Sequence, residues 1–180
     1  MPARSLELKP LRGPSLASPG NDPWRVAATD AARTVMTDFR ERSAISVSED
    51  SPIDAALEHM KHTGVRSAFV LDRDGHKVLG LITAYDIQGE KPLRHMQAAG
   101  WTDRGSSRED VRVRDIMESA ENWQVADIND VDRATVAMVL ESFRRIGRTH
   151  IPVVEHRKGN AEHLRGVFSF AKTTRLLKSE

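Results

Sequence analysis

The sequence contains no cysteine in its 180 residues. Disulfide bonds and thiolate chemistry are therefore excluded, and a reducing compartment is the expected environment. Long hydrophobic runs are also missing. The longest is Val136 to Leu140, whereas a membrane-spanning helix needs about 20 apolar residues. The first residues lack the apolar core of a secretory signal. We therefore predict a cytoplasmic protein that does not cross a membrane.

No excess of one charge is present, because 27 Lys and Arg face 26 Asp and Glu, for a formal net charge of +1. This balance does not favour a nucleic-acid partner, which usually requires a clearly basic footprint. The sequence also lacks a Gly-x-Ser-x-Gly elbow, a Walker-type loop and a His-Glu-x-x-His helix. Its seven histidines are scattered. We predict a protein that is not an enzyme and has no metal site and no cofactor.

Proline is concentrated at the N-terminus, where Pro2, Pro10, Pro14, Pro19 and Pro23 are interspersed with glycine and serine. This composition predicts an extended or disordered segment over residues 1–31. The chain as a whole is 39% hydrophobic and 29% charged, which is typical of a globular protein.

An internal repeat is the most informative feature that is present. The segment from Ala55 to Asp72 recurs from Met138 to Glu155 at a constant offset. In both copies a helical pattern ends at a glycine and a strand-forming run follows. The identical pairs are Leu57/Leu140, Glu58/Glu141, Gly64/Gly147 and Val70/Val153. One supersecondary unit therefore occurs twice.

Each copy predicts the order strand, helix, strand, strand, helix. Asp50-Ser51-Pro52 is a helix-start signal, with a capping side chain next to a proline in the first turn, and Asp74-Gly75 predicts a hairpin. Because roughly 50–60 residues bury only a marginal core, we expect the copies to pack together. The predicted fold is α+β, with two β-α-β-β-α repeats packed sheet to sheet about a pseudo-two-fold axis. The predicted strands are 44–47, 66–71, 78–83, 124–127, 149–154 and 164–169, and the predicted helices are 53–63, 85–88, 132–146 and 171–177.

The motifs of the two copies resemble those of a tandem pair of CBS domains, the cystathionine-β-synthase-type repeat, also called a Bateman module. Thr34-Val35-Met36-Thr37 and Arg114-Asp115-Ile116-Met117 are similar to the short motif that precedes each repeat. Gly80 to Asp86 is similar to the motif that closes it. The resemblance covers about residues 32–178. We assign residues 32–88 to the first repeat, 89–110 to a long connector and 111–180 to the second repeat.

The resemblance implies an adenine nucleoside or nucleotide (AMP, ADP, ATP or S-adenosylmethionine) in the cleft between the repeats. Thr83 and Asp86 would hold ribose hydroxyls or phosphate, since a carboxylate accepts two hydrogen bonds from a vicinal diol. Adenine would lie against apolar residues near the strand that precedes the first helix. The other residues of this predicted site are Ile45, Val47, Arg66, Ser67 and Ala68.

The second copy departs from the closing motif, because Ser169 is retained but Lys172 replaces the expected aspartate. A lysine cannot accept hydrogen bonds from a diol. It could pair with a phosphate or fill the site itself. Arg148 and His150 could face a phosphate. We predict one nucleoside site at Asp86 and one altered or empty site at Lys172.

Two functions follow from these patterns. The first is a regulatory sensor that binds the adenine ligand and signals to a separate effector protein. The alternative is a structural or protein-interaction dimerisation module with a vestigial cleft, in which Thr83 and Asp86 merely cap a helix. In either case the resemblance implies a homodimer. The connector carries Met96 and Trp101, which could pack on the module or on a partner.

Overall fold

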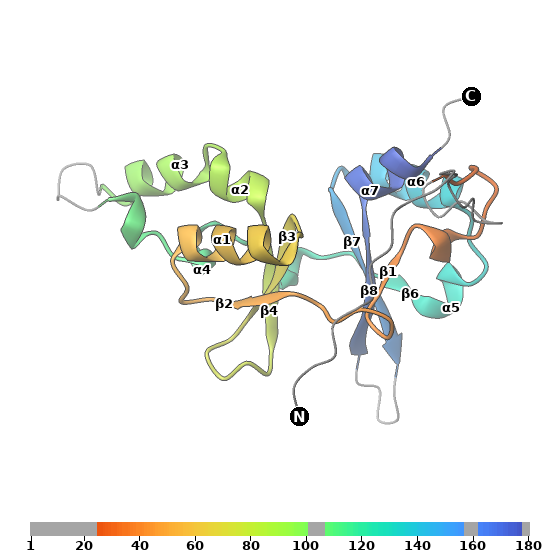
Figure 1. Ribbon diagram of the computed structural model, residues 1–180, viewed down its shortest axis with the longest axis horizontal. Helices are drawn as coiled ribbons and strands as arrows, with labels where there is room; N and C mark the ends of the chain where they lie inside the picture. Colours follow the sequence, from red (N-terminus) through yellow and green to blue (C-terminus); the bar gives the residue numbers. More distant parts are fainter. Residues whose placement is uncertain (1–24, 101–106, 157–161, 178–180) are drawn as a thin grey trace, which may run out of the picture.

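The computed structural model describes residues 25–100, 107–156 and 162–177 (Figure 1). Two four-stranded sheets, each covered by helices on its outer side, meet at the centre of the molecule. Unit 1 has the strand order β2-β3-β4-β5 and unit 2 the order β1-β8-β7-β6. The predicted α+β fold with sheet-to-sheet packing is confirmed.

The strands and helices divide between the two units as follows. The strands of unit 1 are β2 (Ser46–Ser48), β3 (Ser67–Leu71), β4 (Val78–Thr83) and β5 (Glu118–Ser119), and its helices are α1 (Ile53–Thr63), α2 (Ala84–Gln88), α3 (Lys91–Ala98) and α4 (Val113–Ile116). The strands of unit 2 are β1 (Thr37–Asp38), β6 (Ala126–Asp127), β7 (His150–His156) and β8 (Glu162–Ser169), and its helices are α5 (Ile128–Val131), α6 (Val136–Ile146) and α7 (Phe170–Leu176).

The two long helices end as predicted, at Gly64 and Gly147, whose φ angles of 70° and 66° are left-handed. Their starts differ from the prediction. Helix α1 has Pro52 at its N-cap position, without a side-chain cap, so the expected capping by Asp50 or Ser51 is wrong. Helix α6 begins at Val136 rather than at residue 132, because the Thr135 hydroxyl accepts a hydrogen bond from the amide of Met138.

Alternation along the strands separates three apolar clusters, since neighbouring side chains of a strand point to opposite faces. In β3, Ala68 and Val70 face the helices of unit 1, whereas Phe69 faces the other sheet. Phe69 packs with Leu81 of β4 and Val167 of β8 in the cluster that joins the units. The sheets are therefore held together by one side of each strand, while the other side builds the core of its own unit.

The two repeats exchange their edge strands. Strand β1 lies at the start of the first repeat but pairs antiparallel with β8 of unit 2, and β5 lies at the start of the second repeat but pairs with β4 of unit 1. Two equivalent glycines allow this close approach. A Cβ atom on Gly80 would overlap the carbonyl oxygen of Glu118, and one on Gly166 would lie 2.6 Å from the carbonyl oxygen of Thr37. Each unit is thus completed by residues that belong, in sequence, to the other repeat.

A buried ion cluster holds β1 in place. Arg165 of β8 is 7% exposed and contacts the carboxylate of Asp38 in β1. Its Nε atom lies 3.3 Å from Glu155 in β7, and Glu155 also accepts a hydrogen bond of 2.6 Å from Arg40. Paired and hydrogen-bonded charges are the form in which charged groups tolerate burial. Strand β1 is therefore held by these ion pairs as well as by its backbone hydrogen bonds to β8.

Two segments outside the predicted repeats, residues 25–31 and the connector, are more ordered than the sequence predicts. Residues 25–31 lie within the segment predicted to be extended or disordered, but Val26 is buried and its amide donates to the carbonyl of Leu176 over 2.8 Å. The connector contains helix α3, whose Met96 packs against the core of unit 1. Trp101 lies outside the described residues. No helix in the described parts of the chain has both the length and the apolar character to cross a bilayer.

Candidate ligand site between the two units

The predicted site residues lie where each hairpin ends and a short helix begins. In unit 1, Ser67 of β3 is opposite Thr83 of β4. In unit 2, His150 of β7 is opposite Ser169 of β8. The sequence repeat thus places the two pairs at equivalent positions of equivalent hairpins.

Thr83 and Asp86 form a reciprocal cap at the start of α2. The Asp86 amide donates to the Thr83 hydroxyl over 3.1 Å. The Thr83 amide and hydroxyl donate to Oδ2 of Asp86 over 2.9 and 2.7 Å. The capping interpretation is therefore confirmed, and it fixes one carboxylate oxygen, whereas a ligand role for these two residues stays a prediction.

The second carboxylate oxygen of Asp86 is engaged by a lysine that the sequence interpretation did not include. Nζ of Lys91, in the first turn of α3, lies 2.8 Å from Oδ1 of Asp86. The same ammonium donates to the carbonyl of Ile116 over 3.3 Å. The Asp86 side chain is only 15% exposed, whereas that of Lys91 is 48% exposed. The carboxylate is therefore held in place while its cation can leave towards solvent.

Unit 2 contributes His150 and Arg148 to this region. Burial lowers the pKa of His150 below its ordinary value of 6.5, and the charge of the Asp86 carboxylate acts in the opposite direction. Asp86 and His150, from different repeats, are therefore close enough to interact. Arg148 forms an ion pair with Glu118 of β5, so it is bound to the exchanged strand of unit 1 and not free for a phosphate.

The other residues predicted for the first site have mixed placements. Ile45 and Val47 are partly buried against the core of unit 1, with the carbonyl of Ile45 accepting a hydrogen bond from Phe69. Ala68 is 1% exposed and faces the same core, so its side chain is not available to a ligand. Arg66 is exposed, and its carbonyl accepts the amide of Ala84 over 2.9 Å.

Lys172 is engaged within its own half of the molecule. Its Nζ donates to the carbonyl of Met36 over 2.9 Å and to the hydroxyl of Thr37 over 3.2 Å. Burial lowers the pKa of Lys172, and the charges of Arg42 and Arg175 act in the same direction. Ser169 does not cap α7 with its side chain. Both alternatives for this lysine, pairing with a phosphate and filling the site itself, stay predictions.

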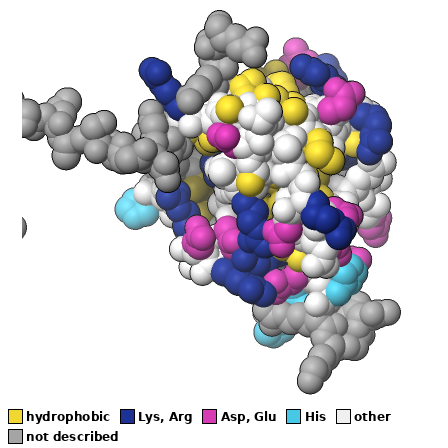
Figure 2. All heavy atoms as spheres, turned by 90° about the vertical axis from the view of Figure 1, so that its right-hand side faces the viewer, with side chains coloured by type: hydrophobic (Ala, Val, Ile, Leu, Met, Phe, Trp, Pro, Cys, Tyr) yellow, Lys and Arg dark blue, Asp and Glu magenta, His cyan; other side chains and the backbone are white. Residues whose placement is uncertain are grey.

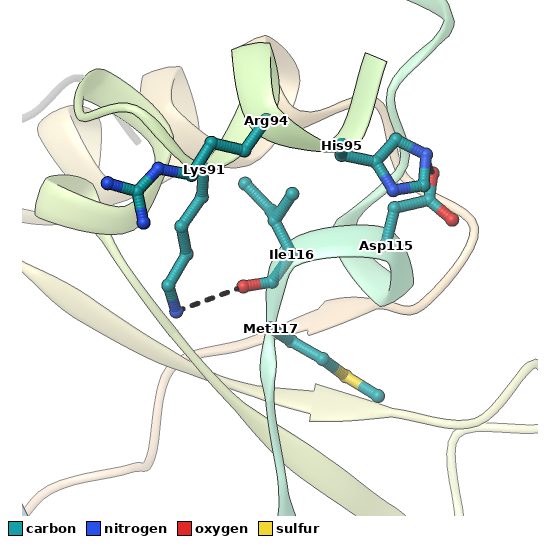
Figure 3. A pocket seen from close by; sticks show the side chains of 6 residues that line it. All are labelled: Lys91, Arg94, His95, Asp115, Ile116 and Met117. Atoms are coloured by element: carbon teal, nitrogen blue, oxygen red, sulfur yellow. Dashed lines mark hydrogen bonds and ion pairs between the residues drawn. The ribbon is translucent and has the colours of Figure 1, made fainter. Parts of the chain in front are cut away.

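An open hollow of about 380 Å³ lies next to Lys91, between α3 and the segment that leads into β5. Figure 3 shows Lys91 reaching from α3 to the Ile116 carbonyl, with Arg94 beside it and His95 above Asp115. Ile116 and Met117 complete the lining. Because Lys91 both lines the hollow and contacts Asp86, the hollow adjoins the predicted nucleoside site.

Sequence reasoning did not find Lys91 or Glu118. Both lie outside the repeated motifs, and their positions depend on how α3 folds back and how β5 crosses to unit 1. The only available signal for Lys91 was its closeness in sequence to Asp86, which by itself indicates nothing about contact.

Comparison with known proteins agrees with this geometry. The family model for the CBS domain matches residues 32–90. An uncharacterized conserved protein from Pyrococcus horikoshii superposes with a TM-score of 0.54 and 21% identity, over 83% of this chain and 92% of that one. A CBS-domain containing protein from Agrobacterium tumefaciens gives 0.53 and 18%, over 90% and 98%.

CBSX2 from Arabidopsis thaliana, in complex with AMP, gives a TM-score of 0.52 and 18% identity, over 82% of this chain and 94% of that one. The search of curated proteins finds no match to the sequence. The resemblance inferred from the repeated motifs is confirmed: residues 32–90 match the CBS-domain model, and the fold of the described chain is similar to that of a CBS-domain containing protein.

Proposed function

We propose that this protein is a regulatory module without enzymatic activity, which binds an adenine nucleoside or nucleotide between its units and signals to a separate partner protein. The observation that carries this proposal is the Asp86 carboxylate. It is oriented by Thr83 and mostly buried, and its charge acts on His150 of the other unit. The similar fold of CBSX2, whose structure is a complex with AMP, supports the choice of ligand class.

The chemistry of the site suits a ribose. Oδ2 of Asp86 accepts hydrogen bonds from Thr83. Oδ1 contacts the ammonium of Lys91, whose long side chain is flexible. Carboxylate oxygens accept hydrogen bonds from vicinal hydroxyls, and such charge-assisted bonds are stronger than neutral ones. A ligand that bridges Asp86 and the His150 region would contact both units. Binding would therefore stabilise one arrangement of the units, which is what a sensor requires.

Thermal unfolding in the presence of ligands tests the proposal. Millimolar AMP, ADP, ATP or S-adenosylmethionine should raise the melting temperature, since a ligand that binds only the folded state stabilises it by mass action. Asp86→Ala should abolish that shift. Because this variant also loses a helix cap, which costs about 1 kcal/mol, its baseline melting temperature should fall as well.

Asp127→Ala is the matched control. Asp127 caps α5 by accepting the amide of Asn129 over 2.7 Å, so its loss should lower the baseline in the same way but leave the ligand shift intact. If no adenine compound shifts the wild-type protein, the proposal is wrong. If both variants retain the shift, Asp86 is not the ligand-binding residue.

Exposed apolar side chains favour a second candidate function, a dimerisation module. Tyr85 of α2 is 84% exposed, Leu93 of α3 53%, Met138 of α6 56% and Phe170 of α7 42%. Figure 2 shows hydrophobic side chains gathered in the upper part of one face, at the height where α6 and α7 lie in Figure 1. Static light scattering tests this function, and a mass of one chain at micromolar concentration would contradict it.

A further inference from the structure

Lys91 occupies the position that a ligand hydroxyl would need. Its ammonium lies 2.8 Å from Oδ1 of Asp86, which is a hydrogen-bonding distance. Oδ2 already accepts two hydrogen bonds from Thr83. Of the roughly four acceptor positions of the carboxylate one is then left, so a diol that donates two hydrogen bonds to it must displace Lys91. Without its carboxylate, the ammonium would keep one weaker contact, 3.3 Å from the carbonyl of Ile116.

Basic side chains gather beside this position. Lys91, Arg94 and His95 are spaced three and four residues apart, so they lie on one side of α3, and all three line the hollow (Figure 3). Asp115 is the one carboxylate among the six lining residues. It faces His95, at 3.8 Å, rather than Lys91. Arg94 pairs with Glu90, but both side chains are 75% exposed, where an ion pair is weak.

We infer that Lys91 changes partners when a ligand binds, leaving Asp86 for a phosphate of the ligand, so that the site selects phosphate-bearing adenine nucleotides over adenosine and S-adenosylmethionine. The inference rests on the proposed function and specifies its ligand class. Lysine suits this exchange, because its four-carbon stem is flexible and its ammonium is a compact point charge.

The selection has a simple physical origin. Adenosine is neutral, so its diol must displace the ammonium from Asp86 without offering that cation a new partner. S-adenosylmethionine brings a sulfonium towards Lys91 and Arg94, which repel it. A nucleotide replaces the lost carboxylate with a phosphate, and an ammonium–phosphate contact is a charge-assisted hydrogen bond. The same lysine therefore opposes binding of the nucleoside and favours binding of the nucleotide.

Isothermal titration of the full chain with AMP and with adenosine tests the exchange. Wild-type protein should bind AMP about tenfold or more tightly than adenosine, the ratio expected when one charge-assisted contact is gained. Lys91→Met should weaken AMP binding about tenfold and leave adenosine binding unchanged or tighter, because Asp86 is then unoccupied. Lys91→Arg should keep the preference for AMP, since it retains the positive charge.

Lys77→Met is the matched control. Lys77 is exposed and lies just before β4, whereas Thr83 ends that strand, so the same substitution there should change neither affinity. Equal affinities of the wild-type protein for AMP and adenosine would overturn the inference and leave the proposed function standing. An equal loss of both affinities in Lys91→Met would show that Lys91 only supports the fold of the site, which also overturns it. If neither compound binds wild-type protein, the inference fails, and if ADP, ATP and S-adenosylmethionine also fail to bind, the proposed function fails with it.

Discussion

Replacing Phe69 by alanine should lower the free energy of unfolding by about 4 kcal/mol. Phe69 is 6% exposed and lies in the cluster that joins the two sheets. Its ring meets those of Phe39 at 5.4 Å and Trp123 at 6.0 Å, both edge to face. Removal of the ring therefore affects the contact between the units rather than the core of either unit.

The expected loss of about 4 kcal/mol combines a cost of truncation, an added cost for lost aromatic pairs and a reduction by relaxation. Truncation of a buried phenylalanine costs about 3–5 kcal/mol, and the loss of two edge-to-face pairs, each worth about 0.5–1.5 kcal/mol, favours the upper part of that range. Phe39 and Trp123 are only partly buried, so they can relax into the space and reduce the cost. The middle of the range is expected, which is a large share of the roughly 5–15 kcal/mol that stabilises most domains.

Urea unfolding followed by circular dichroism at 222 nm measures this change. Val125→Ala is the control, because Val125 is 43% exposed and surface substitutions usually change stability by less than about 0.5 kcal/mol. A loss below about 1 kcal/mol for Phe69→Ala would refute the reasoning that the sheets pack through this ring. It would mean that the two units are held together elsewhere.

Two further substitutions test the exchanged strands and the junction of the units. Gly80→Ala should lower the melting temperature, because the new Cβ overlaps the Glu118 carbonyl. Such overpacking costs about 1–3 kcal/mol. An unchanged melting temperature would contradict the close approach of β5 to β4. Burial lowers the pKa of His150, so the unfolded state binds more protons near pH 6 and stability should rise with pH up to about 6.5–7. In His150→Gln, urea midpoints measured between pH 5 and 7.5 should show a smaller rise, and an identical pH profile would exclude a contribution from His150.

The repeat made most of the fold predictable. Two copies with the same helix, glycine and strand pattern fix the order of elements, and α1, β4 and the ends of both long helices lie where that pattern places them. These features depend on local periodicity and on backbone conformation, which a sequence records directly. The start of α6 was misplaced because Thr135 caps it, while residues 132–134 form a turn after the separate helix α5.

The strand exchange and the cation at Asp86 could not be predicted in this way. Strands of two residues carry almost no periodic signal, so nothing in Thr37–Asp38 or Glu118–Ser119 indicates which sheet accepts them. The contact between Lys91 and Asp86 depends on the direction in which α3 leaves α2. Such positions are decided by tertiary packing, whereas the cap formed by Thr83 and Asp86 is local and was foreseen as one interpretation.

The exchanged strands also bear on how the chain is made. During translation, unit 1 lacks its edge strand until residue 119 has left the ribosome, although the rest of its sheet ends at residue 83. Strand β1, synthesised early, has no partner until β8 appears. Contacts between residues so distant in sequence form slowly. Unit 1 can therefore be completed first, but only after the second repeat has begun to emerge, and a break in the connector would yield two fragments that each need a strand of the other.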